Sequence, residues 1–244
     1  MTTSWDDGHP LDLRVADMLA RHGLAGTFYV PMTSERPTMT REQVREIAAR
    51  FEVGAHTLHH RDLTRLDDAG AAEEITGSRS WVEDVVGGPC ASFCFPKGHF
   101  RRRHLALVRQ AGFAVARTTE LLSLEPPRPT DGLLVMPTTV QARPHPPSVY
   151  ARNCAKRGAV RGFWRYVVHG HTSDWLMLVR ALHALALAGG GVFHLWGHSW
   201  EVEEEGQWGR LDEALRYVAE FSAEAPCVTN AALAGIPGGV EVPA

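Results

Sequence analysis

Apolar residues along this chain fall into two alternating patterns, one with the period of a helix and one typical of short buried strands. The first helical stretch has apolar residues three or four positions apart, at Leu11, Val15, Met18 and Leu19. Gly23 follows them, where a helix C-cap is expected. Residues 25–30 then gather Thr, Phe, Tyr and Val before Pro31, a composition that predicts a strand.

The same alternation continues through most of the chain. Thr40 and Gln43 have the spacing of a capping box, which predicts the start of a second helix. Further helices are expected over residues 67–86, 101–110 and 208–221. Further strands are expected over residues 51–55, 92–95, 113–116, 133–135 and 192–196. Short strands separated by helices are typical of parallel β-α-β units, so the pattern predicts an α/β sheet or barrel.

One stretch breaks this rhythm. Residues 143–147 are rich in proline, and residues 150–171 are basic and aromatic with poor periodicity. We therefore expect an insertion or long loop over residues 137–172, which could shape a substrate pocket. The whole chain, residues 1–244, is expected to form a single domain, because this length is routine for one barrel-like domain.

Composition and charge exclude several classes of protein. With 44% hydrophobic and 22% charged residues, the chain is an ordinary globular protein and not a disordered one. A net charge of −3 offers no field that would attract nucleic acid, so no nucleic-acid partner is expected. The four cysteines are scattered and are expected to be free thiols.

The distribution of apolar residues also bears on membrane insertion and cellular location. The N-terminal residues show no basic segment followed by an apolar run, so no signal peptide is expected. The longest apolar stretch, residues 175–188, is interrupted by Arg180 and His183 and is too short to span a bilayer. We therefore expect no membrane span and a cytoplasmic location.

Two adjacent carboxylates, Asp6 and Asp7, follow a predicted first strand and precede Gly8. At a strand end the turn lets both side chains face one cavity, so one can bind a metal while the other stays free as a base. A plain surface turn is the alternative, because Asp and Gly favour turns.

Two histidines follow another predicted strand. His56 and His60 are four residues apart, so on one helical turn they would share a face and could bind one ion, while His59 would point elsewhere. A histidine-rich polar loop is the alternative. Together with Asp7 they form an Asp-His-His set beside a spare carboxylate, at strand ends where α/β barrels gather catalytic residues. Residues 95–99 and 194–201 place further polar residues at two more strand ends.

These segments resemble the motifs of a known family, the polysaccharide deacetylases, or NodB-like carbohydrate esterases. Residues 4–8, SWDDG, resemble the family's T-F-D-D-G motif, and residues 56–60, HTLHH, match its H-[S/T]-x-x-H motif. Residues 26–30, GTFYV, look like its A-T-F-F-V strand. The resemblance is clear over residues 4–117, weaker over 118–190, and returns at 192–201. It implies a distorted (β/α)7-type barrel.

The resemblance also implies roles at the matching positions. Asp6 is the expected general base, and Asp7, His56 and His60 are the expected ligands of one divalent metal. Zn²⁺ is the first choice for an Asp/His₂ site with an open position, and Co²⁺, Ni²⁺ and Mn²⁺ are alternatives. Residues 95–98 resemble the third motif only at its Pro and Gly, and the backbone N–H of Lys97 is the candidate oxyanion donor.

Other roles stay open between candidates. His198 is the first candidate for the general acid and His194 its rival, and His198 lies nearer the strand end. The arginine that opens the family's third motif is absent. Arg117 is the candidate to pair with Asp6 instead, and a surface arginine is the alternative. The candidate substrate-binding residues lie in the third and last motifs: Pro96, Gly98, His194, Trp196, Trp200 and Glu201. Core packing is the alternative for the tryptophans, and Glu201 is also a candidate to orient His198.

The function that these residues imply is metal-dependent hydrolysis of a linear amide. We expect removal of an N-acyl group, most simply N-acetyl, from an N-acylated sugar or glycoconjugate of small size. An allantoinase-like hydrolase of cyclic amides is one alternative. A non-catalytic carbohydrate-binding or metal-storing relative is another, although a binder would not need the free carboxylate of Asp6. The last is a plain α/β domain in which all these residues are structural.

Overall fold

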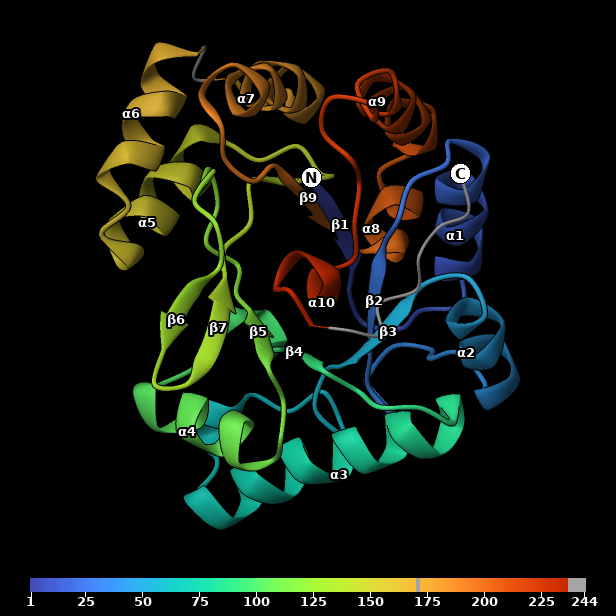
Figure 1. Cartoon of the computed structure of the whole chain (residues 1–244). Helices are drawn as coiled ribbons and strands as arrows, with labels where there is room; N and C mark the ends of the chain where they lie inside the picture. The colour runs from blue at the N-terminus through green and yellow to red at the C-terminus, as the bar shows by residue number, and fades with distance from the viewer. Residues whose placement is uncertain (170–171, 237–244) are drawn as a thin grey trace.

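A curled nine-stranded sheet forms the centre of the molecule, and most helices cover its outside, while the short helix Asn230–Leu233 lies within the curl (Figure 1). The computed structural model describes residues 1–169 and 172–236. The strands lie in the order β6-β7-β5-β4-β3-β2-β1-β9-β8. Neighbouring strands pair in parallel except β6 and β7, which are antiparallel. The strands are β1 (Thr2–Trp5), β2 (Thr27–Val30), β3 (Glu52–Ala55), β4 (Ser92–Cys94), β5 (Val115–Arg117), β6 (Arg128–Thr130), β7 (Leu133–Met136), β8 (Val140–Gln141) and β9 (His194–Gly197).

The predicted fold class is confirmed, as a barrel that is left open between its edge strands β6 and β8. The helices are α1 (Asp12–Arg21), α2 (Arg41–Ala48), α3 (Asp68–Val86), α4 (Arg102–Gln110), α5 (Pro147–Arg157), α6 (Val160–Val168), α7 (Trp175–Gly189), α8 (Ser199–Glu204), α9 (Trp208–Ala219) and α10 (Asn230–Leu233). Two short 3₁₀ turns, η1 (Leu63–Arg65) and η2 (Pro96–Gly98), follow β3 and β4.

Local signals in the sequence determine where several helices begin and end. The Thr40 side chain accepts from the Gln43 N–H while the Gln43 side chain accepts from the Thr40 N–H, so the predicted capping box is present. Asp67 caps α3 by accepting from the Gly70 N–H, and Gly87 ends that helix in the left-handed conformation, with φ 76°.

Residues 137–172, expected to be an insertion or long loop, contain β8 and the helices α5 and α6. Residues 170 and 171 of this stretch lie outside the described residues. The prolines that suggested a loop precede α5 or begin it, since Pro147 is its first residue, where the missing N–H costs nothing. Gly158, with φ 64°, ends α5 two residues before α6 begins, so the stretch forms two short helices and not one long periodic helix.

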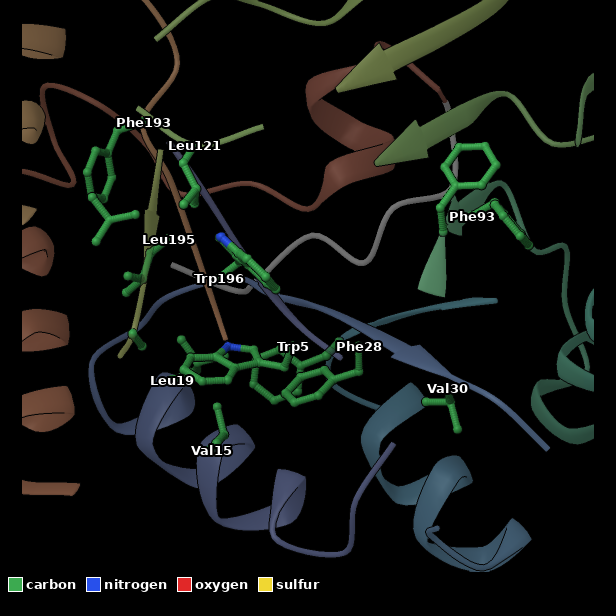
Figure 2. Close-up of a cluster of buried hydrophobic side chains, with 14 of the residues drawn as sticks. Trp5, Val15, Leu19, Phe28, Val30, Phe93, Leu121, Phe193, Leu195 and Trp196 are labelled. Atoms are coloured by element: carbon green, nitrogen blue, oxygen red, sulfur yellow. The ribbon is translucent and has the colours of Figure 1, made fainter. Parts of the chain in front are cut away.

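The core packs on both faces of the sheet, which is why all four residues of β1 are buried. Alternation along the strand directs Trp5 outwards, where it lies against α1 together with Leu19 and Phe28 (Figure 2). The same alternation directs Ser4 and Asp6 towards the inside of the curled sheet. The outer apolar layer therefore fixes which carboxylate of the Asp6-Asp7 pair enters the interior.

Two further sequence predictions concern cysteines and membranes. All four cysteines, each of which lies within the described residues, are free thiols, as predicted. Across residues 1–169 and 172–236, no helix combines the length and apolar character that crossing a membrane requires.

Gly54 lies in a tightly packed part of the sheet. A Cβ at this position in β3 would lie 2.5 Å from the Tyr29 ring and 3.0 Å from the Ser92 carbonyl oxygen. We expect Gly54→Ala to lower the free energy of unfolding by about 2 kcal/mol, because overpacking a tight core costs this much. Urea unfolding measures the change. As a control, Gly209→Ala in α9 meets no atom within 4 Å and should be neutral or slightly stabilising. Equal stability of the two variants would contradict the prediction.

Candidate active site

The carboxyl ends of β1, β3, β4, β5 and β9 meet around a cleft of about 780 Å³. The segments that follow these strands supply its walls. Of the residues predicted for the site, most line this cleft: Asp6, Asp7, His56, His60, Lys97, Trp196, His198, Trp200 and Glu201. The cleft lies at the edge of the sheet where catalytic residues of α/β barrels gather.

Asp7, His56 and His60 form a compact set of candidate metal ligands. The Asp7 Oδ1 atom lies 3.4 Å from His56 Nε2 and 3.1 Å from His60 Nε2. One ligand atom from each of the three residues lies within 4.8 Å of the other two. His56 Nδ1 lies 2.9 Å from the Cys94 carbonyl oxygen and donates to it, which leaves the Nε2 lone pair directed at Asp7.

The charge state of Asp7 suits metal binding. Burial by itself would raise the pKa of this carboxyl, but its contacts with His56 and His60 and the charge of His198 hold the pKa well below its usual range. Its buried Oδ1 atom makes no hydrogen bond in the part of the chain that the structure describes. An ionised, buried oxygen facing two imidazole nitrogens fits a divalent cation, so the residues present fit the metal that the sequence predicts.

The sequence suggested that the two histidines share one helical turn, but the structure has no helix there. Residues 56–60 form a tight turn in which Thr57 and His60 have positive φ values of 60° and 51°. The turn brings the two rings to a centroid separation of 4.9 Å. His59 points elsewhere, as predicted, and its Nδ1 lies 2.8 Å from Glu74 Oε1.

Steric contacts explain why glycine follows the two aspartates of the Asp-Asp-Gly motif. Asp7 and Gly8 both have positive φ, at 76° and 58°. A Cβ at position 8 would lie 2.6 Å from Val30 Cγ1, so only glycine fits against β2 there. This turn places the Asp7 side chain in the cleft next to Asp6.

A second group of potential ligands, formed by Asp6, His56 and Cys94, is less suited to a metal. Burial raises the pKa of the Cys94 thiol, so the sulfur stays protonated. Asp6 already has a cationic partner, since its carboxylate forms an ion pair with Arg117.

Arg117 lies inside the curled sheet next to Asp6, the partner that the sequence suggested for it. Its side chain is fully buried, and its guanidinium lies 4.8 Å from the centre of the Trp196 ring and 5.2 Å from that of Tyr29. The predicted pairing with Asp6 is therefore present, and the alternative of a surface arginine is wrong.

The two candidate general acids have very different surroundings. His198 lines the cleft, with Nε2 3.8 Å from Asp7 Oδ2 and Nδ1 2.7 Å from Glu201 Oε2. Burial lowers the pKa of His198, but the hydrogen bond to Glu201 and the charges of Asp7 and Asp6 outweigh burial and raise it above 6.5. This imidazole can therefore carry a proton near neutral pH.

His194 lies deeper in the same sheet, below the cleft. Its Nε2 contacts Ser4 Oγ at 2.8 Å and its Nδ1 contacts the Pro137 carbonyl oxygen at 3.1 Å. Burial lowers the pKa of His194 to about 3, so the ring is neutral at neutral pH. The prediction that His194 binds substrate, or serves as the acid, is wrong because the residue belongs to the core.

Glu201 holds His198 and is itself held by two residues that the sequence analysis missed. Gln141 Nε2 donates to Glu201 Oε2 at 2.8 Å, and Arg143 forms an ion pair with the other oxygen. Both follow or end the two-residue strand β8, inside the stretch that was expected to be a loop. A polar pair at a strand end is a usable signal, but a strand this short leaves no pattern.

The remaining predicted residues divide between the cleft and its supports. Trp200 donates its indole N–H to Asp7 Oδ2 at 2.9 Å, and the guanidinium of Arg36 covers its ring at 3.5 Å. Trp200 therefore positions a predicted metal ligand, and one of its faces is unavailable for stacking on a sugar. Pro96 and Gly98 are buried and do not line the cleft, contrary to the prediction that they bind substrate. They shape the η2 turn that carries Lys97 to the cleft, with φ 58° at Lys97.

The buried ion pair makes a prediction about stability. Arg117→Gln leaves the Asp6 carboxylate buried without a cation, so we expect the free energy of unfolding to fall by about 3–5 kcal/mol. Urea unfolding followed by circular dichroism measures this. The exposed pair of Arg102 and Asp131 is the control, and Arg102→Gln should cost less than about 1 kcal/mol. A similar small cost for both variants would show that the buried pair contributes little.

Comparisons with known proteins agree with this geometry. The polysaccharide deacetylase family model matches residues 1–116. No curated protein matches the chain by sequence. Among solved structures, a proposed polysaccharide deacetylase from Mycobacterium smegmatis is similar, with TM-score 0.69 and 14% identity over all of this chain and 93% of the other.

Two further structures share the fold. The chitin deacetylase of the fungal pathogen Colletotrichum lindemuthianum has TM-score 0.61 and 13% identity, covering all of this chain and 91% of its own. The family 4 carbohydrate esterase from Streptomyces lividans, in complex with acetate, has TM-score 0.54 and 15% identity, covering 91% and 87%. Identities this low support the fold and not a shared activity. The chain is thus similar to the polysaccharide deacetylases in sequence over residues 1–116, and it shares the fold of solved deacetylases over its whole length.

Proposed function

We propose that this protein is a metal-dependent N-deacylase that removes an N-acyl group, most simply N-acetyl, from an amino sugar or a small glycoconjugate. One observation carries the proposal. A carboxylate outside the metal ligand set, Asp6, and a protonatable imidazole, His198, both lie in the cleft beside the Asp7-His56-His60 cluster. A protein that only bound a metal or a sugar would need neither group there.

The metal site contributes electrophilic chemistry. A divalent ion held by Asp7, His56 and His60 would polarise the acyl oxygen and acidify water, as such ions do in hydrolases. Three protein ligands leave a position open, which favours a catalytic over a structural site. We propose Zn²⁺, because two imidazoles and one carboxylate are a ligand set that suits it.

Asp6 takes the role of general base in this proposal. Its ion pair with Arg117 fixes the orientation of the carboxylate, and Cys94 Sγ lies 3.8 Å from its Oδ2. A general base contributes only when it is within reach of the proton that it removes. In this proposal, the contacts with Arg117 and Cys94 hold the Asp6 carboxylate towards the water that attacks the acyl carbon.

His198 takes the role of general acid. It donates a proton to the leaving amine nitrogen, which would otherwise depart as an unstable anion. Glu201 accepts from Nδ1, so the proton to be transferred sits on Nε2, which faces Asp7 and the cleft. The backbone N–H of Lys97, at the bend of the η2 turn, is the proposed donor to the developing oxyanion.

The surroundings of the cleft support a polar substrate such as an amino sugar. The cleft mixes cationic, anionic and aromatic side chains, which is typical of a polar ligand such as a sugar. The similar enzymes named for chitin and carbohydrate esters act on sugars. Four free thiols fit a cytoplasmic location, so we propose that the substrate is found there.

Metal content and activity measured side by side test the proposal. We expect one metal ion per chain in the wild type and N-deacetylase activity on a panel of N-acetylated amino sugars. His60→Ala should lose both the metal and the activity. Asp6→Asn should keep the metal and lose at least about 100-fold in kcat, the contribution typical of a general base.

His59→Ala is the matched control, because His59 lies in the same turn but pairs with Glu74. It should keep the metal. A wild type that binds no metal at this site would contradict the proposed mechanism. An Asp6→Asn variant with full activity would remove Asp6 from the role of base.

Glu201 makes a prediction about pH dependence. Its carboxylate raises the pKa of His198, so Glu201→Gln should lower that pKa. Activity that needs a protonated His198 is lost as pH rises through its pKa, so the alkaline limb of kcat/KM should move to lower pH. We also expect activity to fall roughly 10- to 100-fold at the optimum. Glu203→Gln, on the exposed side of α8, should leave the profile unchanged. An unmoved alkaline limb in Glu201→Gln would argue against His198 as the acid.

A further inference from the structure

Helix α6 presents an apolar stripe to solvent. Five of the six large apolar side chains that are exposed in residues 1–169 and 172–236 belong to this helix. They are Val160, Phe163, Trp164, Val167 and Val168. Their spacing of three or four residues puts them on one face of α6, and the most exposed are Val160 at 77% and Trp164 at 67%. A contiguous patch of this kind marks an interaction surface more often than a scattered apolar residue does.

The opposite face of α6 already packs against the rest of the protein, so the helix does not need the apolar stripe to hold it in place. Gly162 allows close approach to the Leu122 backbone, where a Cβ would lie 3.3 Å from the carbonyl oxygen. Tyr166 is buried and stacks on Tyr150 of α5 with ring centroids 4.7 Å apart. The Tyr166 hydroxyl donates to the Thr172 carbonyl oxygen. The helix is thus anchored through one face and carries its apolar residues on the other.

The sequence around the stripe is strongly basic. Between Asp131 and Asp174 there is no acidic residue, whereas the chain as a whole has a net charge of −3. The cations of this segment are Arg143, Arg152, Lys156, Arg157, Arg161 and Arg165. Arg143 lines the cleft and pairs with Glu201 and Glu205, and Arg161 and Arg165 lie within 4 Å of Glu125. Arg152 and Lys156 of α5 are exposed, and Arg161 of α6 is 85% exposed. Apolar and basic residues therefore occur together on the α5–α6 pair, which lies at one corner of the molecule (Figure 1).

The charge decides which partner fits this surface. A second copy of the chain, docked through the same stripe, would bring two basic surfaces together, with Glu125 as the acidic group that pairs with Arg161 and Arg165 in each copy. A lipid surface with anionic headgroups meets both features, because aromatic and aliphatic side chains enter the boundary of the acyl chains while Arg and Lys stay among the phosphates. We propose that α6, with the basic residues of α5, docks this protein on the surface of a membrane that contains anionic lipids.

The proposed docking surface is close to the cleft. Val149 and Asn153 of α5 line the cleft, while α6 packs against the same helix. The proposal stands on the exposed stripe and its charge and does not require the proposed N-deacylase activity. It does mean that a substrate carried on a membrane lipid would be brought near the cleft.

Vesicle binding tests the proposal. The full chain should sediment with vesicles of phosphatidylcholine that contain about a third phosphatidylglycerol, and more weakly with pure phosphatidylcholine or at high salt. Val160→Ser combined with Trp164→Ser should weaken binding at least about tenfold, because these side chains lose their burial in the lipid boundary. Both are highly exposed, so the variant should keep the circular dichroism spectrum and the unfolding midpoint of the wild type.

A matched pair of charge reversals tests the electrostatic part. Arg161→Glu should weaken binding roughly tenfold, whereas Arg102→Glu, 84% exposed on the distant helix α4, should not. Folded wild type that ignores anionic vesicles, or a serine variant that binds like wild type, would overturn the proposal. So would a dimer in solution that the serine variant dissociates, since a second copy would then cover the stripe. Activity on soluble N-acetylated sugars, measured in parallel, reports separately on the proposed enzyme function.

Discussion

The ion pair between Asp6 and Arg117 is the contact on which the rest of the site depends. In the sheet, β1 and β5 are separated by three strands, so the pair reaches across the inside of the curl and not between neighbours. Both groups are buried, and neither charge could stay there without the other. The aromatic rings of Tyr29 and Trp196 beside the guanidinium complete its surroundings. The pair therefore holds the curl of the sheet and the floor of the cleft at the same time.

Adjacent aspartates acquire different chemistry here because their partners differ. Asp6 faces a permanent cation inside the sheet, whereas the left-handed turn at Asp7 directs that carboxylate at two imidazoles. A similar division separates the two histidines of the last motif. His194 faces Ser4 and a backbone carbonyl in the core, while His198, four residues later, faces Glu201 and Asp7 in the cleft. In both pairs, position relative to the end of a strand decides what the side chain can do.

The sequence could predict what depends on local spacing and could not predict what depends on distant packing. The capping box at Thr40, most of the strands and the separate Asp6-Asp7 and His56-His60 motifs followed from residue patterns, since each pattern is completed within a few residues. The grouping of Asp7 with the two histidines came from the strand-end positions and the family resemblance. The burial of His194 could not be predicted, because alternation assigns a face of the sheet but not a depth. The helix α6 was not predicted, because residues 137–172 were expected to form an insertion or long loop; its apolar face points to solvent and not to a core.

The backbone around the cleft has a consequence for how the metal is gained and lost. Asp7 and His60, two of the three proposed ligands, have positive φ, as does Thr57 between the histidines, and the third ligand, His56, is fixed by the Cys94 carbonyl. Such conformations cost free energy and persist only when the surrounding fold enforces them. The ligand geometry is therefore a property of the sheet and its turns. We expect the metal site to keep its geometry without the ion. A chelator should then remove the metal without unfolding the chain, and added metal should bind again without refolding.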